Sequence, residues 1–396
     1  MKRLILSIAL CLCMLAGCVP AEPTPNPPDA PALQVYREQY ASRRGFLSLS
    51  AAQQQNYDAL FTAVTEQTDS DTFITIDQSG RQTLGLRVTL PVPLTQAEEI
   101  ATLFAALLGD NPAFFYIDNT YTYEGYRVGD AYRYNALCLS FTMNAAERKT
   151  AQAQMDAALA TLTAGAAALP QGERAVLLHD RLIAHATYDE QAAESDTPDK
   201  THPFAFTIYG ALVQQKAVCE GYARAYMLLC QLADIPCATV GGTETATNGP
   251  HMWNIVTIDG ADYHTDVTWD DRGDTALHVY CHLTAEEIGR THTFDKDAWG
   301  QTADATAENW YIKNDRYQPR YDRTAIAKAI AARVAAGDTV IEWRFSPEHL
   351  SSIALFVKNR TWFSEAVEEH LPDGVKMWEY DSLFFKENGV MVLKKK

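Results

Sequence analysis

Basic residues are scarce in this chain of 396 residues. It has 33 Lys and Arg against 50 Asp and Glu, which gives a formal net charge of −17 at pH 7. A protein that binds nucleic acid needs a basic surface to neutralise phosphates, so the composition argues against nucleic acid as a partner. Beyond the N-terminal residues, no apolar stretch is long enough for a transmembrane helix.

Cysteine pairs with the spacing of a metal site are also missing. No C-x-x-C occurs after residue 18, and the cysteines beyond that point number five, so one of them stays unpaired within the chain. We expect Cys219 to be that free thiol. The other four allow two disulfides or none, and they are Cys138, Cys230, Cys237 and Cys281.

The histidines show no spacing typical of a metal site, and the acidic residues that follow Trp269 lack the pattern of a calcium loop. The sequence therefore predicts no metal and no cofactor. His179 and His185 are interpreted as ordinary helix residues. Four further histidines receive no role, at positions His264, His278, His282 and His292.

The N-terminal residues have the pattern of a secretion signal. Lys2 and Arg3 precede a continuous apolar run that ends at Leu15, which is too short to span a bilayer comfortably. The run ends in Leu-Ala-Gly-Cys, which resembles the bacterial lipobox and implies cleavage before Cys18 and lipidation of its sulfur. An ordinary signal peptide cut near Ala21 is the alternative. The pattern predicts an extracytoplasmic, bacterial membrane-anchored lipoprotein.

A proline-rich segment follows the predicted signal. Residues 19–34 contain six prolines in sixteen positions. In polyproline geometry such a segment extends by about 3.1 Å per residue, so it reaches on the order of 50 Å. We predict a tether that holds the folded part of the chain away from the membrane.

Cys219 stands at the head of a helical run, 220–233, in which most positions are apolar. The run ends before Pro236, because proline disfavours the α conformation in the residue that precedes it. A thiol in the first turn of a helix lies near unpaired N–H groups and the positive end of the macrodipole, and both favour the thiolate. The position predicts a nucleophile, although a cysteine in an apolar helix is usually inert core.

A β-hairpin is predicted downstream of this helix. Residues 251–258 alternate at the period of a strand, and Asp259-Gly260 is a strong two-residue turn. Such a turn pairs Ile258 with Ala261 and so fixes the register of the two strands.

This register predicts a carboxylate beside an imidazole. It places His251 opposite Thr268, and Asp266 falls on the same face, diagonal to His251 and within side-chain reach. We expect Asp266 to orient the imidazole of His251, while the preceding helix presents the thiol of Cys219 to the other ring nitrogen.

The segments AVCEGYARAY, HMWNIV and HTDVTWDD, in this order and at this spacing, resemble the core of the transglutaminase-like superfamily. The resemblance extends over residues 172–292, about a third of the chain. It implies a papain-like fold with a Cys-His-Asp triad, in which Cys219 is the nucleophile, His251 the base and Asp266 the residue that orients the base. The segment YGAL, which begins at Tyr209, resembles the bacterial lipoprotein-type members. Tyr209 is a candidate oxyanion donor, although packing on the helix explains a tyrosine at this position equally well.

The predicted fold class is α+β, with a papain-like transglutaminase core in which the nucleophile helix packs on an antiparallel sheet. Two smaller α/β domains flank this core. The predicted parts are a lipoprotein signal peptide (1–17), a Pro-rich tether (18–34), an N-terminal α/β domain (35–165), a transglutaminase-like catalytic domain (166–308) and a C-terminal small α/β domain (309–396).

Local patterns support the flanking domains. Sequences with the form of capping boxes begin at Ser50, Thr95 and Asn144, and each opens an apolar-periodic helix. Gly129-Asp130 predicts a hairpin turn in the N-terminal domain. The C-terminal domain is expected to contain a helix over 323–336, a strand over 339–345, a second helix near 350–362 and a hairpin around Asn388-Gly389.

The resulting hypothesis is acyl transfer or hydrolysis through a thioester at Cys219. If the amide is a glutamine side chain, the products are crosslinked or deamidated proteins; if it is a backbone amide and water resolves the thioester, the enzyme is a peptidase. The expected partners are protein or peptide substrates of the cell envelope or the extracellular space, and the membrane through the lipid anchor. The alternative is a catalytically inactive envelope-binding lipoprotein that uses the same fold as a binding module.

Overall fold

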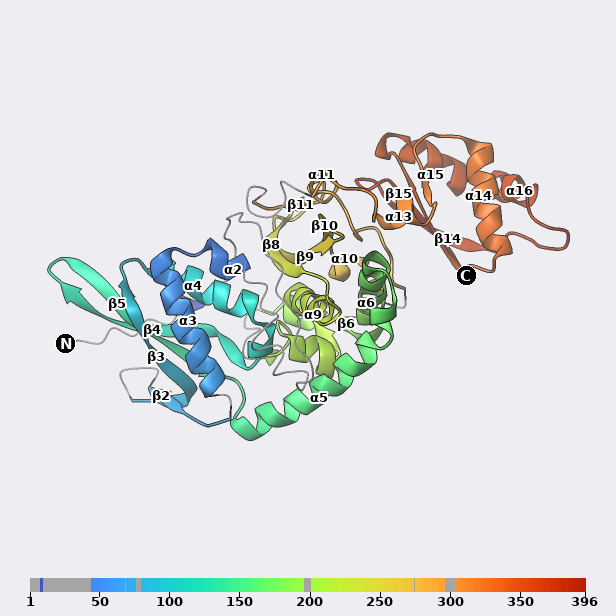
Figure 1. The fold of residues 1–396 in the computed structure, drawn as a ribbon. Helices are drawn as coiled ribbons and strands as arrows, with labels where there is room; N and C mark the ends of the chain where they lie inside the picture. Colours follow the sequence, from blue (N-terminus) through green and yellow to red (C-terminus); the bar gives the residue numbers. More distant parts are fainter. Residues whose placement is uncertain are drawn as a thin grey trace.

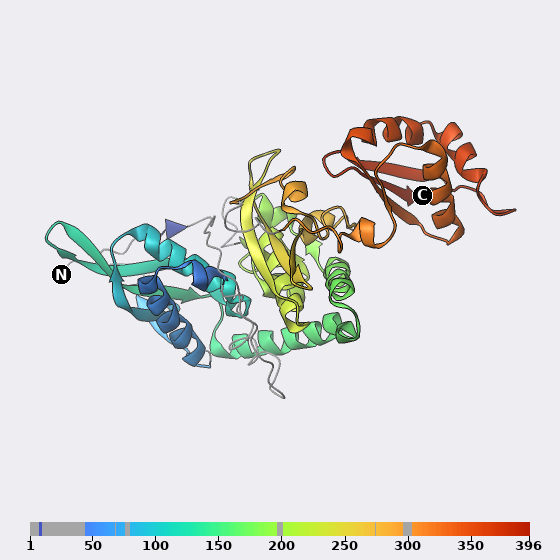
Figure 2. The ribbon, with the colours of Figure 1, turned by 45° about the horizontal axis from the view of Figure 1, so that its top comes forward.

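A computed structural model describes residues 8–9, 44–67, 69–75, 80–195, 201–273, 275–295 and 303–396. The predicted tether and Cys18 lie outside these residues, as does the predicted signal peptide except for the strand β1 (Ile8–Ala9). The described chain forms three units in a row, each with its own sheet (Figures 1 and 2). Within this part of the chain, no helix combines the length and apolar character needed to cross a membrane.

The first unit is an antiparallel sheet of order β1-β4-β5-β3-β2, with α3 packed on β3 and on α4 (Figure 1). All strand pairs of this sheet are antiparallel, so the predicted α/β class is wrong for this unit, which is α+β. Its elements are α2 (Arg44–Ser48), α3 (Ala51–Glu66), β2 (Phe73–Thr75), β3 (Gln82–Leu94), α4 (Ala97–Asp110), β4 (Ile117–Val128), β5 (Ala131–Phe141) and α5 (Ala145–Thr163).

The second unit places the helix α9 against an antiparallel sheet of order β10-β9-β8-β11 (Figure 1). A parallel two-stranded sheet, β6-β7, precedes α9. The elements are α6 (Gln171–His185), β6 (Thr187–Tyr188), α7 (Glu190–Ala193), the π-helical turn η3 (Gly210–Gln214), β7 (Lys216–Ala217), α9 (Cys219–Leu232), β8 (Cys237–Glu244), β9 (Pro250–Ile258), β10 (Ala261–Thr265), α10 (Val267–Asp270), α11 (Ala285–Ile288) and β11 (His292–Thr293).

The third unit is a sheet of order β12-β13-β15-β14, in which only the β12-β13 pair is parallel, with helices against it. The expected second helix is interrupted at Asn359, which caps a new helix, so it forms two helices. The elements are α13 (Trp310–Lys313), β12 (Tyr317–Gln318), α14 (Arg323–Ala335), β13 (Val340–Phe345), α15 (Leu350–Lys358), α16 (Arg360–Glu368), β14 (Tyr380–Phe385) and β15 (Val390–Lys395).

Capping residues fix where several helices begin. The predicted capping boxes at Ser50 and Asn144 are present, each with its side chain and that of the residue three positions later bonded to the backbone. The box predicted at Thr95 is displaced by one residue. There Glu99 accepts from the backbone N–H groups of Thr95 and Gln96, and α4 begins after Gln96.

The register predicted for the hairpin β9-β10 is confirmed at the turn. Asp259 and Gly260 have φ of 49° and 82°, and Ile258 pairs with Ala261. The pairing does not continue to Thr268, however, because β10 ends at Thr265 and the chain turns into α10. The predicted opposition of His251 and Thr268 is therefore wrong.

Helix α9 is buried along almost its whole length. Its residues from Gly221 to Gln231 are buried, and its large side chains join an apolar core shared with the first unit. The side-chain amide of Asn254 on β9 donates to the carbonyl of Ala223 at 2.8 Å, which ties the helix to the central strand of the sheet. Burial of each large apolar side chain contributes roughly 1.5–3 kcal/mol, so packing fixes the helix in place.

Apolar cores connect the units. One core runs without interruption from Leu49 in the first unit to Val267 in the second. On the other face of the β8-β9 sheet, Trp253 packs in a second core that also contains Val390 and Val392 of β15. The predicted domain boundaries stay predictions, but the apolar packing crosses both boundaries between the folded domains.

The five described cysteines are all free thiols. Cys138, Cys230, Cys237 and Cys281 are buried, and Cys219 is half-buried. Of the two alternatives left open by the sequence, the structure has the one without disulfides among these residues.

Gly221, in the first turn of α9, has no room for a side chain. A Cβ there would lie 2.6 Å from the carbonyl oxygen of Ala205 and 2.7 Å from the Cβ of Ala217. We expect Gly221→Ala to push the start of the helix outward and lower the free energy of unfolding by about 1–3 kcal/mol, measured by urea denaturation. Gly241→Ala on β8 is the matched control, because a Cβ there meets nothing within 4 Å. Equal destabilisation by both changes would contradict the expectation.

Candidate active site

The nucleophile candidate Cys219 is the first residue of α9, as predicted. Val218 precedes it in extended conformation and makes no side-chain cap, while its own N–H donates to the carbonyl of Ala205 at 3.0 Å. The first helical hydrogen bond is donated by the backbone N–H of Tyr222 to the carbonyl of Val218. The thiol therefore lies among helix N–H groups without intrahelical partners, where a negative charge is favoured.

His251 lies near the start of β9, opposite Gly242 of β8. Its Nε2 donates to Oδ2 of Asp266 at 2.7 Å. The imidazole lies beside the rings of Trp253 and Trp269, whose centroids are 6.0 and 5.3 Å from its own. The predicted contact between His251 and Asp266 is therefore present, although the strand pairing ends at Thr265.

The carboxylate of Asp266 is fully buried and uses both of its oxygens. Oδ1 accepts from the N–H of Trp269 at 3.1 Å and so caps α10. Oδ2 accepts from His251 and also from Nε2 of His292 at 3.1 Å. The backbone N–H of Asp266 donates to the carbonyl of Tyr280 at 3.1 Å. Every one of these bonds limits the movement of the carboxylate that holds the imidazole.

His292 is a member of this site that the sequence left without a role. It lies on the two-residue strand β11, is buried, and packs between Trp253 and Trp269 at centroid distances of 4.7 and 4.4 Å. Only the sheet pairing of β11 with β8 brings it to Asp266. A two-residue strand has no periodic pattern that could have indicated this position.

The electrostatics favour an ionised pair at the centre of the site. Burial by itself would lower the pKa of His251, but the charge and hydrogen bond of Asp266, with an added hydrogen bond to Cys219, raise it to about 10. Burial likewise opposes ionisation of Asp266, yet His251 and His292 hold the pKa of this carboxyl well below its usual range. Both groups are thus charged at neutral pH.

The thiol of Cys219 shares a hydrogen bond with His251 in addition to its position at the helix start. Because Nε2 of the imidazole is bonded to Asp266, Nδ1 is the ring nitrogen left for the thiol. The structure therefore brings Cys219, His251 and Asp266 together in the order nucleophile, imidazole and carboxylate. This arrangement can transfer a proton from sulfur to nitrogen and stabilise the resulting charges.

The structure does not support Tyr209 as an oxyanion donor. Its hydroxyl donates to Oε1 of Gln154 on α5 at 3.2 Å. Its ring stacks on Phe115 and meets Phe204 edge-on, with centroids 5.8 and 5.1 Å away. Aromatic packing, which the sequence could not separate from catalysis, is the interaction that this tyrosine makes.

Tyr188 is the tyrosine that lies near the thiol. It is half-buried on β6, and its pKa is raised first by burial and then by the charge of Cys219, with smaller contributions from Glu190 and Asp266. Among the described residues its hydroxyl makes no hydrogen bond, so this donor is free to bind a ligand. The sequence gave no residue-level reason to choose Tyr188 over Tyr209.

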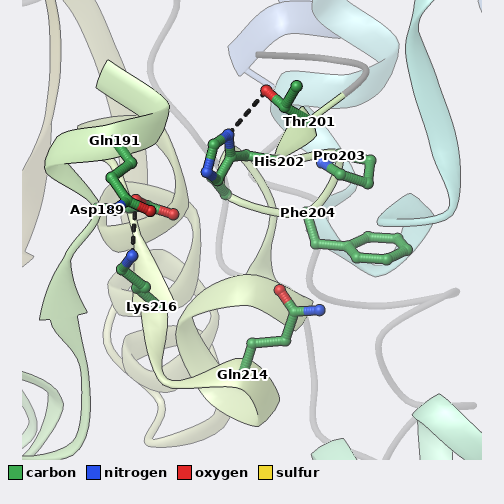
Figure 3. A pocket seen from close by; sticks show the side chains of 9 residues that line it. Asp189, Gln191, Thr201, His202, Pro203, Phe204, Gln214 and Lys216 are labelled. Carbon is green, nitrogen blue, oxygen red and sulfur yellow. Dashed lines mark hydrogen bonds and ion pairs between the residues drawn. The ribbon is translucent and has the colours of Figure 1, made fainter. Parts of the chain in front are cut away.

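A cavity of about 390 Å³ lies beside β7, the strand that leads into α9 (Figure 3). Asp189 and Lys216 form an ion pair of 3.0 Å on its wall, and His202 and Phe204 line the opposite part. Ala205, whose carbonyl holds Val218, also lines it. The cavity thus shares its wall with the segment that positions the thiol, and it presents both charged and apolar groups.

Two groups of side chains in the described part of the chain have donor atoms close enough together to hold a metal ion. In the first, His251, Asp266 and His292 place one donor atom each within 4.8 Å of one another. In this group both imidazoles are hydrogen-bonded to the carboxylate of Asp266. The second group lies outside the triad.

Comparison with known proteins identifies the class of this central part. Residues 156–269 match the family model described as the transglutaminase-like superfamily. The matched segment contains Cys219, His251 and Asp266. This central part of the chain is therefore similar to the transglutaminase-like core.

Two individual proteins are similar to the chain. Kyphoscoliosis peptidase of Mus musculus is 30% identical over 119 residues, which make up 27% of this chain and 17% of that protein. A solved structure titled "Crystal structure of a TGase" has 16% sequence identity and a TM-score of 0.26, over 39% of this chain and 46% of that one. The chain thus spans less than a fifth of the length of the curated relative it matches.

A charged imidazole beside Cys219 should make the thiol reactive at low pH. We expect iodoacetamide to alkylate Cys219 readily near pH 6 in the full chain. His251→Ala should slow the reaction most at that pH and much less above the ordinary thiol pKa of about 8.5. Mass spectrometry of the peptide that contains Cys219 gives the rate. Labelling that occurs only on unfolding, or at equal rates in both proteins at pH 6, would indicate a structural cysteine.

The raised pKa of His251 also predicts a pH dependence of stability. The group titrates near pH 10 when folded and near 6.5 when unfolded, so its ion pair stabilises the fold fully below about pH 6.5 and this stabilisation is lost as the pH rises through about 10. The difference in unfolding free energy between the wild type and His251→Gln should shrink over this range by up to about 1.4 kcal/mol per pH unit. Urea denaturation at several pH values tests this; a difference that stays constant contradicts it.

Proposed function

We propose that this chain is a thiol enzyme of the transglutaminase-like type, which acts on protein or peptide amides through a thioester. One observation carries the proposal: Nε2 of His251 lies 2.7 Å from the buried carboxylate of Asp266, while Cys219 interacts with the same imidazole at the start of α9. The site contains a nucleophile, a base and a group that orients the base, in contact with one another.

The chemistry requires proton transfer at a single nitrogen. The thiolate of Cys219 bonds to the amide carbonyl carbon, and the C–N bond breaks as Nδ1–H of His251 protonates the departing amine or ammonia. An amine or water then attacks the thioester and gives its proton back to Nδ1, and the C–S bond breaks. Asp266 stabilises the imidazolium in each ionised state. A lysine amine as acceptor gives a crosslink, and water gives deamidation or proteolysis.

The oxyanion of the tetrahedral intermediate needs hydrogen-bond donors close to the sulfur. The backbone N–H of Cys219 has no intrahelical partner, and the hydroxyl of Tyr188 is free among the described residues. We assign the side-chain donor to Tyr188 in place of Tyr209. Removal of one oxyanion donor typically costs about 100- to 1,000-fold in turnover.

The location of the enzyme is proposed from the sequence of residues 1–34. A lipid on Cys18 and a proline-rich tether would anchor the chain at the outer side of a bacterial membrane. Substrates would then be proteins or peptides of the cell envelope or the extracellular space.

Incubation of the full chain with envelope proteins and a labelled primary amine tests the activity. We expect either labelled glutamines or new chain termini by mass spectrometry, and we expect both kinds of product to be absent with Cys219→Ala. Tyr188→Phe should slow product formation by at least about 100-fold, whereas the matched change Tyr209→Phe should leave it within a few-fold of the wild type.

The two kinds of product separate crosslinking from proteolysis. If the wild type and Cys219→Ala both give no product but bind the same envelope proteins, the enzyme proposal fails and an inactive binding module replaces it. If Tyr209→Phe is the more damaging of the two tyrosine changes, the assignment of the oxyanion donor is wrong.

A further inference from the structure

A second cluster of titratable groups is buried between the second and third units, apart from the triad. Nδ1 of His179 and Nε2 of His278 lie 2.8 and 3.1 Å from the same oxygen, Oδ1 of Asp180. These three donor atoms all lie within 4.8 Å of one another. His179 and Asp180 come from the middle of α6, and His278 comes from the segment after α10, almost a hundred residues later.

Each imidazole has a carboxylate on its other ring nitrogen. Nε2 of His179 lies 3.3 Å from Oδ2 of Asp270, and Nδ1 of His278 lies 2.8 Å from Oε1 of Glu342. Both of these carboxylates are buried. Histidines that bind metals usually donate their second ring N–H to a carboxylate, which fixes the ring and makes the other nitrogen a better ligand.

The charges of the cluster favour a cation. Three carboxylates, those of Asp180, Asp270 and Glu342, face two imidazoles, and within the described chain no lysine or arginine forms an ion pair with them. Without a further positive charge, the buried carboxylates must be balanced by two protonated histidines or by protonation of a carboxyl. A divalent cation bound between the two neutral imidazoles would balance the negative charge of the carboxylates without protonating these groups.

We propose that His179 Nδ1, Asp180 Oδ1 and His278 Nε2 bind a divalent transition-metal ion, for which zinc is the probe. Zinc takes imidazole and carboxylate ligands at about 2.0–2.2 Å, so neighbouring donors of a tetrahedral site lie roughly 3.3–3.6 Å apart. Binding therefore requires the donors to separate by a few tenths of an ångström from the 2.8 and 3.1 Å observed in the structure. The side chain of Asp180 is 41% exposed, so an ion can reach this ligand from solvent. The sequence gave no sign of this site, because the three ligands lie on two distant segments.

The ion would join segments of the described chain that lie far apart in the sequence. Its ligands come from α6 and from the segment after α10, while Glu342 belongs to β13 of the third unit. Glu342 also accepts from the hydroxyl of Tyr311 at 2.7 Å, and the ring of His278 stacks on Trp310 at 3.9 Å. The supporting groups are thus held rigidly around the ligands.

Zinc binding by the full chain tests the proposal. After dialysis against micromolar zinc and then metal-free buffer, mass spectrometry of the metals should find about one ion per chain. Asp180→Asn and His278→Gln should lose the ion, and Glu342→Gln should bind it about 10- to 100-fold more weakly. His185→Gln is the matched control, because this histidine lies on the same helix and its Nε2 bonds to the carbonyl of Leu212, outside the cluster.

Cys219→Ala separates this site from the triad, whose thiol and imidazole could also take zinc. The proposal requires that Cys219→Ala and His185→Gln keep the ion. A wild type that retains no zinc overturns it, as does an ion that is lost in Cys219→Ala but kept in Asp180→Asn. Because Asp180 is partly exposed, Asp180→Asn should fold; an added zinc-dependent rise in melting temperature in the wild type, absent in Asp180→Asn, gives a second readout.

Discussion

The candidate active site depends on one carboxylate that has no contact with solvent. Asp266 caps α10 with one oxygen and holds two imidazoles with the other. A buried charge is costly unless it is fully hydrogen-bonded, so these partners are conditions for folding as well as for chemistry. The same interactions that allow Asp266 to be ionised inside the protein fix the ring of His251 in the orientation that its other nitrogen needs.

The sheet of the second unit is covered on both faces, and each face serves a different purpose. One face carries α9, with Asn254 bonded to its backbone, and this packing places the thiol. The other face contacts the segment after α10 and the strand β15 of the third unit. His251 lies on β9 between these two packed layers, so a displacement of either layer would move the imidazole.

Short-range patterns, together with the family resemblance, predicted that Cys219, His251 and Asp266 lie together. The apolar run after Cys219 predicts the helix, and the Asp259-Gly260 turn fixes the register that brings His251 near Asp266. The predicted strand pairing continued too far along the sequence, because the alternating pattern does not show that Asp266 leaves the strand and caps a helix. The contact with Asp266 survives this error because the carboxylate reaches across the end of the ladder.

Long-range contacts set the limit of what the sequence predicted. His292 reaches the site only through the pairing of a two-residue strand, and Asp180 and His278 meet across almost a hundred residues. The choice between Tyr188 and Tyr209 also depends on tertiary packing, because each tyrosine precedes a short helical segment in the sequence. Periodicity and turn chemistry describe neighbours along the chain, and these contacts are not between such neighbours.

The position of Glu342 in the sequence bears on the order in which parts of the chain fold. Synthesis releases the N-terminal residues first, and domains generally fold as they emerge. The first unit, which shares a core with α9, is therefore complete before the triad is, and it offers α9 an apolar surface as soon as the helix forms. The partner of His278 arrives last, from a strand close to the C-terminus. Until that strand emerges, Nδ1 of His278 lacks the carboxylate to which it bonds in the folded chain.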